Sequence, residues 1–195
     1  MEGQLIISVS REFGSGGHDI AKKISEDFGI KFYDKNILDE IAKVKDTTAD
    51  KLADFDEKRG GLLRRVLDIP GLGDSSVSEM QFSFLHKRAE LGESFVVVGR
   101  CSEVVLKEFD GLFKVFVLGN KKEKLQRVMK KYELGADAAL ELMEESDKKR
   151  RHYHNYYSER KWGDSRAYDL CINSSHLGVN GTAEIIESYI KEALK

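Results

Sequence analysis

The chain has 195 residues, which is enough for one domain with an inserted lobe and excludes a large multidomain assembly. Hydrophobic residues make up 41% and charged residues 34% of the chain, a globular balance that excludes an intrinsically disordered protein. The 32 Lys and Arg residues and the 34 Asp and Glu residues give a formal charge of -2, so any surface that binds phosphate or nucleic acid must be local.

The first predicted elements are a strand, a polar glycine-rich loop and a helix. Residues 5–9 form a β-rich apolar run, and apolar residues recur at helical spacing over residues 20–28. Gly29 is the expected helix stop, and residues 30–33 predict a second strand that ends at Asp34.

The segment after the second strand has a helical pattern and no convincing strand. Apolar residues recur at helical spacing over residues 37–41, 62–67 and 77–85. Residues 69–76 contain the only proline and predict a surface loop. We therefore expect a helical lobe, at about residues 35–92, inserted between strands.

Three more strands are predicted over residues 95–98, 113–118 and 168–172, and a final amphipathic helix over residues 183–193. Continuous apolar strands that alternate with helices are typical of a parallel sheet covered on both faces. The sequence therefore predicts an α/β fold of three layers with a five-stranded parallel sheet, in a single domain over residues 1–195.

The chain has no predicted membrane or disulfide features. No apolar run reaches the roughly 18 to 20 residues of a membrane span, and residues 1–7 lack the pattern of a signal peptide, so we expect a cytoplasmic protein without a membrane partner. Cys101 and Cys171 lie far apart beside apolar segments and are expected to be buried free thiols. Two such cysteines cannot form a metal site, and no residue is assigned as a metal ligand.

The glycine-rich loop is the sharpest candidate site. Gly14, Gly16 and Gly17 allow positive φ and close approach of the backbone, so successive N–H groups can point into one concavity at a helix N-terminus. Together with Ser15 and His18, these glycines are the expected phosphate-binding residues. A tight strand-to-helix turn without a ligand is the alternative.

The loop departs from the full phosphate-loop pattern, because Gly17 stands where the lysine belongs and no Ser or Thr follows within the loop. That lysine neutralises the β- and γ-phosphates, and the hydroxyl ligates Mg²⁺. Arg11, at the opposite lip of the loop, is the expected replacement because a guanidinium is charged at every working pH. For His18 both a phosphate contact and a neutral hydrogen-bonding role are open, because a helix N-terminus disfavours the cation.

Two further candidates follow the second and third strands. Asp34 and Arg100 come at the carboxyl ends of these strands, which is where open α/β sheets bind ligands, so both are expected to reach the loop. Asp34 would accept a hydrogen bond from a substrate hydroxyl or hold a metal-bound water. A structural ion pair with an arginine is the alternative for Asp34.

Residues 147–157 carry four consecutive cations and three tyrosines. On a helix, Asp147 shares a face with Arg150, Arg151 and His154, so two guanidiniums could close over phosphates while Asp147 orients one of them. The alternatives are a solvated basic helix and a surface that faces RNA. The negative formal charge argues against nucleic acid as a partner.

The chain resembles the cytidylate kinase-like family of bacterial P-loop proteins, which are relatives of the nucleoside monophosphate kinases. The resemblance extends from about Leu5 to the C-terminus. It is carried by residues 7–21, Phe32-Tyr33-Asp34-Lys35, Val97-Val98-Gly99-Arg100, Asp147-Lys148-Lys149-Arg150, Tyr156-Tyr157, Trp162-Gly163-Asp164 and residues 168–173. It implies a P-loop kinase-like fold with a helical monophosphate-binding lobe after the second strand and a lid, at about residues 120–165, after the fourth.

The resemblance also implies site residues and cofactors. Asn173 and Ser174 match the loop that packs on the donor adenine, and ATP and Mg²⁺ are the implied cofactors. Val98 is a departure, because cytidylate kinases carry an acid at this position. Four arginines match positions that bind donor and acceptor phosphates: Arg100, Arg127, Arg150 and Arg151.

The first functional hypothesis is a kinase that transfers the γ-phosphoryl group of ATP to a nucleoside monophosphate such as CMP, by positioning and charge. Its catalytic residues would be Arg11, Arg150 and Arg151. The alternative is a catalytically impaired nucleotide-binding regulatory protein, for which the absent lysine is the argument. Small-molecule nucleotides are the expected partners in both cases.

Overall fold

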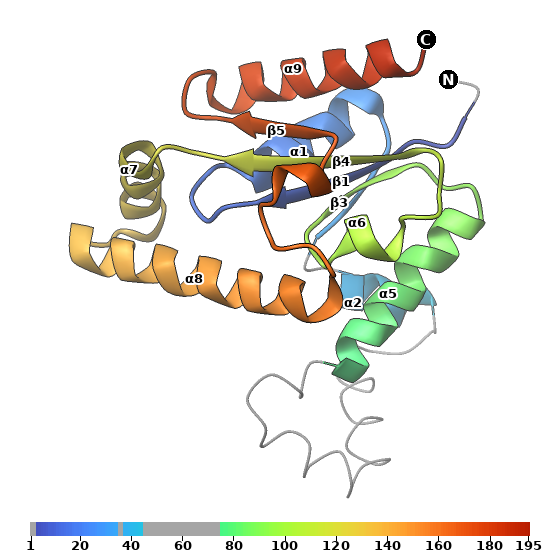
Figure 1. The fold of residues 1–195 in the computed structure, drawn as a ribbon, viewed down its shortest axis with the longest axis horizontal. Helices are drawn as coiled ribbons and strands as arrows, with labels where there is room; N and C mark the ends of the chain where they lie inside the picture. The colour runs from blue at the N-terminus through green and yellow to red at the C-terminus, as the bar shows by residue number, and fades with distance from the viewer. Residues whose placement is uncertain (1–2, 35–36, 45–74) are drawn as a thin grey trace, which may run out of the picture.

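The fold is built around one parallel sheet of five strands, shown in Figure 1. This computed structural model describes residues 3–34, 37–44 and 75–195. The strands are β1 (Ile6–Arg11), β2 (Lys31–Tyr33), β3 (Phe95–Val98), β4 (Leu112–Leu118) and β5 (Leu170–Asn173). They lie in the order β2-β3-β1-β4-β5, and each neighbouring pair is parallel. This topology confirms the predicted α/β fold.

β1 is the central strand, because its apolar and small residues can be buried on both faces. It pairs with β3 on one side and with β4 on the other, so that Ile6 lies opposite both Phe95 and Leu112. Its carboxyl end, Arg11, therefore lies in the middle of the sheet edge at which open α/β sheets bind ligands.

Helices cover both faces of the sheet and complete three layers (Figure 1). Their bounds are α1 (Gly17–Phe28), α2 (Ile37–Val44), α5 (Ser75–Glu90), α6 (Ser102–Val105), α7 (Lys121–Tyr132), α8 (Ala136–Tyr157) and α9 (Gly178–Ala193). Ile7 and Val9 of β1 pack in one core cluster with α1 and α9, whereas Ile6 packs on the opposite face with α2, α5 and α6. α7 and α8 pack on each other around Val128 and Met143.

Two element ends test the sequence predictions. Gly29 ends α1 with a φ of 64°, a left-handed conformation that favours glycine, as predicted. The pattern predicts a fifth strand from residue 168, but β5 begins at Leu170. The reason is a short 3-10 helix, η1 (Ser165–Ala167), which precedes the strand and is capped by the Asp164 carboxylate.

Helices α2 and α5 lie where the helical patterns over residues 37–41 and 77–85 predict them. The helix predicted over residues 62–67 lies outside the described residues. So does the predicted loop up to residue 74, and α5 begins at Ser75.

Both cysteines are free, but only Cys101 is buried. The expectation of a buried thiol is wrong for Cys171, because β5 is an edge strand. Its Leu170 and Ile172 pack against the core cluster of α1 and α9, and the intervening Cys171 points to the other, open side. Over the described ranges, no helix combines the length and the apolar character that a membrane span requires.

Candidate functional site

The glycine-rich loop between β1 and α1 has the geometry of an anion-binding turn. Gly14 and Gly16 both have a φ of 80°, the left-handed conformation that favours glycine. Gly16 precedes α1 and has no side chain to cap this helix end, so the N–H groups of the first turn after Gly17 are available to bind an anion. The Ser15 hydroxyl is used within the loop, where it donates to the Glu12 carbonyl oxygen and accepts from the Gly17 N–H.

Neighbouring elements require glycine at two loop positions. A Cβ atom at Gly14 would lie 2.9 Å from Cγ2 of Val128 on α7, and one at Gly17 would lie 2.6 Å from Cβ of Arg11. Non-bonded carbon atoms pack at about 3.5 to 4.0 Å, so neither position has room for a side chain. The loop is therefore confined between α7 and the end of β1.

Two side chains from distant segments hold the carbonyl groups of the loop. Arg127 on α7 donates to the carbonyl oxygen of Gly14 over 2.5 Å and also lines the cavity beside the loop. The buried Ser174 donates to the carbonyl oxygens of Ser15 and Leu118. The resemblance assigns Ser174 to an adenine-binding surface, and in the structure its hydroxyl is directed at the glycine-rich loop.

Asn173, the other predicted adenine-loop residue, belongs to a hydrogen-bond network. Its Nδ2 donates to Oδ1 of Asn120 over 2.8 Å, and its Oδ1 accepts from the Ser175 N–H over 3.0 Å. Oγ of Ser175 in turn accepts from the Asn120 N–H. These bonds fix the turn after β5 against the start of α7.

Sequence reasoning missed an ion pair that lies beside the loop. Nζ of Lys124 on α7 is 2.8 Å from Oε2 of Glu12, and the same oxygen accepts from the Gly119 N–H. The Lys124 side chain is 11% exposed. No local pattern predicts this pair, because its two residues lie 112 positions apart.

A cavity of about 850 Å³ opens beside the loop, which is within the size range of small-molecule sites. It brings together residues predicted from five separate segments of the sequence. The predicted site residues in its lining are Arg11, Gly14, Gly16, Gly17, His18, Asp34, Arg100, Arg127 and Arg150. Lys131, Tyr132, Lys149 and Tyr153 also line it, and none of these four is among the predicted site residues.

Three arginines make this cavity electropositive. Burial, together with the positive charges of Arg150 and Arg100, lowers the pKa of Arg11 to about 9. Arg11 still carries its proton at pH 7. Burial also lowers the pKa of Arg150, although Asp147 opposes this shift. A phosphate group in the cavity would relieve the repulsion among the three guanidiniums.

The backbone after β3 places two of these arginines. Gly99, Arg100 and Cys101 have φ values of 74°, 61° and 50°, which are three successive left-handed conformations. Such strain in non-glycine residues gathers at functional sites. A Cβ atom at Gly99 would collide with Nη1 of Arg11, so the Arg11 guanidinium lies against the end of β3. Arg11 therefore reaches from the phosphate loop to the segment that carries Arg100.

α8 contacts the loop through Asp147 and Arg150. Oδ1 of Asp147 accepts from the Phe13 N–H over 2.7 Å and lies 3.7 Å from Nη1 of Arg150. Nη1 of Arg150 donates to the carbonyl oxygen of Arg11 over 3.2 Å. Burial raises the pKa of Asp147, although the hydrogen bond from Phe13 opposes this. Asp147 is thus in position to orient Arg150, the role that the sequence assigns it.

Arg151 lies outside the cavity at the loop. It is exposed, and its Cζ atom lies 5.6 Å from the centroid of the Trp162 ring. Successive residues of an α-helix point about 100° apart, so Arg150 and Arg151 face different surroundings.

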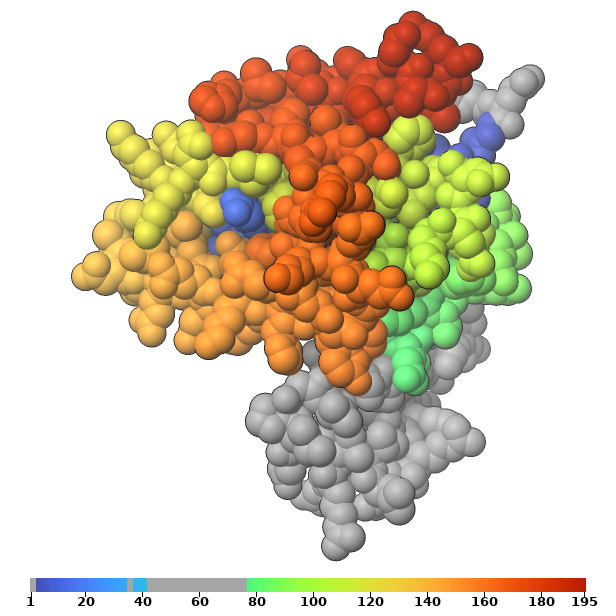
Figure 2. Space-filling model, in the orientation of Figure 1, coloured from blue at the N-terminus to red at the C-terminus, as the bar shows by residue number. Residues whose placement is uncertain are grey.

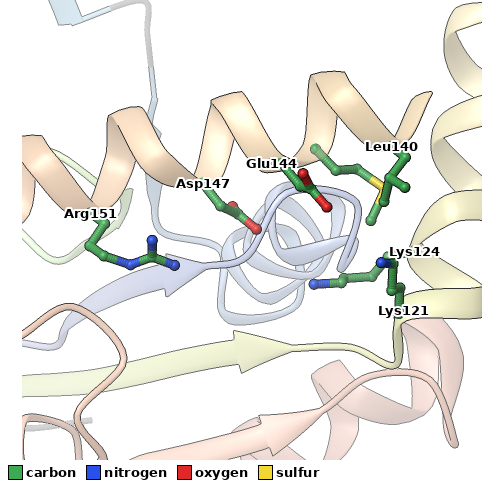
Figure 3. Close-up of a pocket in the computed structure, with 7 residues that line it drawn as sticks. Lys121, Lys124, Leu140, Glu144, Asp147 and Arg151 are labelled. Atoms are coloured by element: carbon green, nitrogen blue, oxygen red, sulfur yellow. The ribbon is translucent and has the colours of Figure 1, made fainter. Parts of the chain in front are cut away.

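A second, smaller cavity of about 290 Å³ lies between α7 and α8 (Figure 3). In Figure 2 a blue patch of the N-terminal segment is visible in a hollow between α7 (yellow) and α8 (orange). The lining residues of this second cavity are Lys121, Lys124, Leu140, Met143, Glu144, Asp147 and Arg151.

His18 links two carboxylates in the larger cavity. Its Nε2 lies 2.9 Å from Oδ2 of Asp34, and its Nδ1 lies 3.4 Å from Oδ1 of Asp19. Carboxylate oxygens are ligands that Mg²⁺ prefers in proteins, together with the phosphates of a bound nucleotide. Asp19 and Asp34 therefore fit this ion. Among the residues with described positions, no group of three or more His, Cys, Asp or Glu could hold a metal, so phosphates and water would supply most ligands.

Comparisons with known proteins show to which family the chain belongs. The model of the cytidylate kinase-like family matches residues 6–176. A curated cytidylate kinase from Methanococcus vannielii is 26% identical over 192 residues, which cover 96% of this chain and 100% of that protein.

Solved structures give the same fold. An uncharacterized protein from Eubacterium ventriosum is 39% identical with a TM-score of 0.78, over 96% of this chain and 99% of that chain. A shikimate kinase from Bacteroides thetaiotaomicron is 12% identical with a TM-score of 0.55, over 96% and 98% of the two chains. The second likeness concerns the fold alone, which is that of P-loop kinases.

Proposed function

Because the chain belongs to the cytidylate kinase-like family, as its motifs indicate, we propose that it transfers the γ-phosphoryl group of ATP to a nucleoside monophosphate, with CMP as the first acceptor to test. The observation that carries this proposal is the convergence of Arg11, Arg100 and Arg150 on one cavity beside the glycine loop. The proposal includes a cytoplasmic location, where both substrates are available.

On the donor side, the free N–H groups at the start of α1 bind the phosphates of ATP. Arg11 takes the part of the absent loop lysine, because its guanidinium is charged and lies at the same cavity. Arg127 contributes from the other side of the loop, where it also holds Gly14 in place.

The transfer step needs position and charge rather than a covalent nucleophile. Arg150 stabilises the charge that develops on the transferred group, and Asp147 orients it. A phosphate monoester has a second pKa of about 6, so the acceptor phosphate is already a nucleophilic dianion at pH 7 and requires no general base. Arg100 binds that phosphate, and the Asp34 carboxylate, held by His18, faces the acceptor.

Mg²⁺ bound with ATP would neutralise phosphate charge, and Asp34 and Asp19 are the residues that would hold it through water. The Ser15 hydroxyl is engaged within the loop and is not free for the metal. This difference from a full phosphate loop leaves the charge on the donor phosphates largely to the arginines.

A nucleotide-binding regulatory protein is the second candidate. The observation that favours it is the absence of both the loop lysine and a free loop hydroxyl, the two groups that most directly support transfer. It would keep nucleotide binding, because the backbone of the loop and the arginines remain.

The deciding experiment measures diphosphate formation from ATP and Mg²⁺ with CMP, dCMP, UMP, AMP and GMP as acceptors. Arg11→Ala and Arg150→Ala are each expected to lower kcat/KM by about 100-fold or more, as removal of a donor to a developing charge does. Arg166→Ala is the matched control, because this exposed arginine pairs with Asp164 and lines neither cavity.

Each alternative has its own outcome. A contaminating kinase would produce equal rates in wild type and variants. If no acceptor is turned over while ATP still raises the melting temperature, the regulatory protein replaces the kinase. Arg151→Ala tests the remaining predicted catalytic arginine: a loss comparable to that of Arg150→Ala would show that it moves into the site during the reaction.

A further inference from the structure

A buried ion pair joins α6 to α8 behind the larger cavity. Nε2 of His154 lies 2.8 Å from Oε1 of Glu103, and the two side chains are 4% and 3% exposed. In no other ion pair of the described residues are both side chains as buried. The helical pattern predicts that His154 shares a face with Arg150 but indicates no role for it.

Glu103 is fixed from the sheet side as well. Its Oε2 lies 3.5 Å from Oγ of Ser8 on β1, and that hydroxyl is 2.7 Å from Oγ of Ser102. All three residues are buried. The carboxylate is therefore held in a polar pocket between the central strand and α8.

The charge state of the pair follows from its surroundings. Burial lowers the pKa of His154, but the carboxylate of Glu103 close to the ring outweighs it, and the net shift is upward. Nδ1 of His154 lies 3.4 Å from Oδ1 of Asn155. Two more titratable groups near Glu103 are the thiol of Cys101 and the hydroxyl of Tyr168, whose pKa values burial raises, so both are neutral.

The pair connects two of the segments that carry cavity arginines, those of Arg100 and Arg150. Glu103 follows Arg100 by three residues, after the left-handed turn that begins α6. His154 follows Arg150 by four residues, a spacing that puts both on one face of α8. A movement of His154 away from Glu103 would therefore carry Arg150 with it.

The second half of α8 is supported by polar and aromatic contacts. Ala139 and Met143, in the first half, pack in the apolar cluster with α7, whereas the core clusters of the described residues include no later residue of α8. The later residues contact α5 through the Tyr153 hydroxyl and through the Tyr157 ring, whose centroid lies 5.0 Å from that of Phe82. A buried ion pair adds little net stability compared with apolar packing, but it can impose one docking geometry.

We propose that Glu103 and His154 are positioning residues, whose ion pair docks the second half of α8 so that Arg150 keeps its contact with Arg11 at the cavity. This inference rests on the proposed function, because the contact matters for transfer only if Arg150 acts on phosphate.

The test compares Glu103→Gln, His154→Gln and the double variant with wild type, at a temperature at which all four are folded. Each single variant leaves one buried charged partner unpaired and is expected to lower kcat by about 10- to 100-fold, the effect of displacing a positioned group. KM for ATP should stay within about threefold, because Arg150 acts on the transferring group. The neutral double variant should recover part of kcat. Glu108→Gln, in the exposed His86–Glu108 pair, is the matched control and should leave kcat unchanged.

The only tryptophan of the chain supplies a readout that does not depend on activity. The backbone N–H of Trp162 donates to Oδ1 of Asn155 on α8, and the Trp162 ring packs against Arg151. Its fluorescence should therefore shift in Glu103→Gln and His154→Gln, and stay unchanged in Glu108→Gln.

A positioning role requires both changes, so an unchanged kcat or an unchanged Trp162 emission in the single variants overturns it. If wild type turns over no acceptor, the proposed kinase activity fails separately. The pair is then judged on Trp162 emission alone, which should shift in the single variants and not in the control. An unchanged emission overturns the positioning role in that case as well.

Discussion

The hydroxyl of Ser174 donates a hydrogen bond to the carbonyl oxygen of Ser15 over 2.5 Å and so joins the turn after β5 to the phosphate loop. Both side chains are fully buried. The same hydroxyl lies 3.2 Å from the carbonyl oxygen of Leu118, at the end of β4. The shape of a loop at the start of the chain therefore depends on a residue close to its other end.

Ser174→Ala is expected to destabilise the protein and weaken nucleotide binding. The substitution leaves buried carbonyl groups without this donor, at a cost of about 1 to 3 kcal/mol. Urea unfolding should show the loss, and the rise in melting temperature with ATP should shrink. Ser188→Ala is the control, because that exposed hydroxyl bonds only the carbonyl oxygen of Glu184 within α9. Equal behaviour of the two variants would contradict the role of Ser174.

Gly17→Ala is expected to displace Arg11, because the added Cβ would lie 2.6 Å from the Arg11 Cβ, an atom close to the backbone that cannot move aside cheaply. Overpacking of this kind costs about 1 to 3 kcal/mol. Titration calorimetry should show a Kd for ATP at least about tenfold higher. Gly3→Ala is the control, since a Cβ there meets no atom within 4 Å. An unchanged affinity in Gly17→Ala would mean that the loop can shift without loss of function.

Asp147 is expected to show opposite effects on stability and activity. Because burial raises its pKa in the folded protein, the charged carboxylate disfavours folding at pH 7, and this penalty is relieved as the pH falls through the folded pKa. Asp147→Asn keeps an acceptor for the Phe13 N–H and removes the charge, so it should hold or raise the melting temperature at pH 7. It should still lower kcat, because Arg150 loses the carboxylate that orients it.

Asp147→Ala is the comparison for that variant. It leaves the Phe13 N–H without its partner and should cost about 1 to 3 kcal/mol. If Asp147→Asn destabilises the protein as much as Asp147→Ala does, the charge of the carboxylate does not disfavour folding at pH 7.

The His154–Glu103 pair predicts a pH dependence of stability. The folded pKa of His154 is raised, so its contribution is fully present below the unfolded value of about 6.5 and is lost as the pH rises through the folded pKa. The free energy of unfolding in urea, measured from pH 5.5 to 9, should decrease across this window by at most about 1.4 kcal/mol per pH unit from this group. The decrease should be smaller in the Glu103→Gln/His154→Gln double variant. Identical pH profiles would show that His154 does not titrate with folding.

The parts of the fold that the sequence predicts are those with local patterns. Continuous apolar strands alternate with helices along the chain, and this alternation predicts the parallel sheet. Asp34 and Arg100 reach the cavity because the carboxyl ends of parallel strands meet at one edge, a rule that requires no knowledge of side-chain packing.

The parts that the sequence does not predict are polar contacts between distant segments. The Glu12–Lys124 and Glu103–His154 pairs leave no periodic trace, because each partner has an ordinary place in its own element. Arg151 illustrates a second limit of the sequence pattern. Helical periodicity predicts which side of α8 a residue occupies only to within about one position, so it does not separate Arg150 from Arg151. In the structure Arg151 packs against Trp162 instead of lining the larger cavity.

The position of β1 has a consequence for synthesis of the chain. The ribosome delivers β1 first, but its two neighbours begin at Phe95 and Leu112, so the strand stays unpaired until about half of the chain has been made. The hydroxyl that holds Ser15 arrives later still, with Ser174. A nascent chain that stops short of this residue would contain every glycine of the loop but not the contact that gives the loop its shape, so nucleotide binding should mark the completion of folding rather than its start.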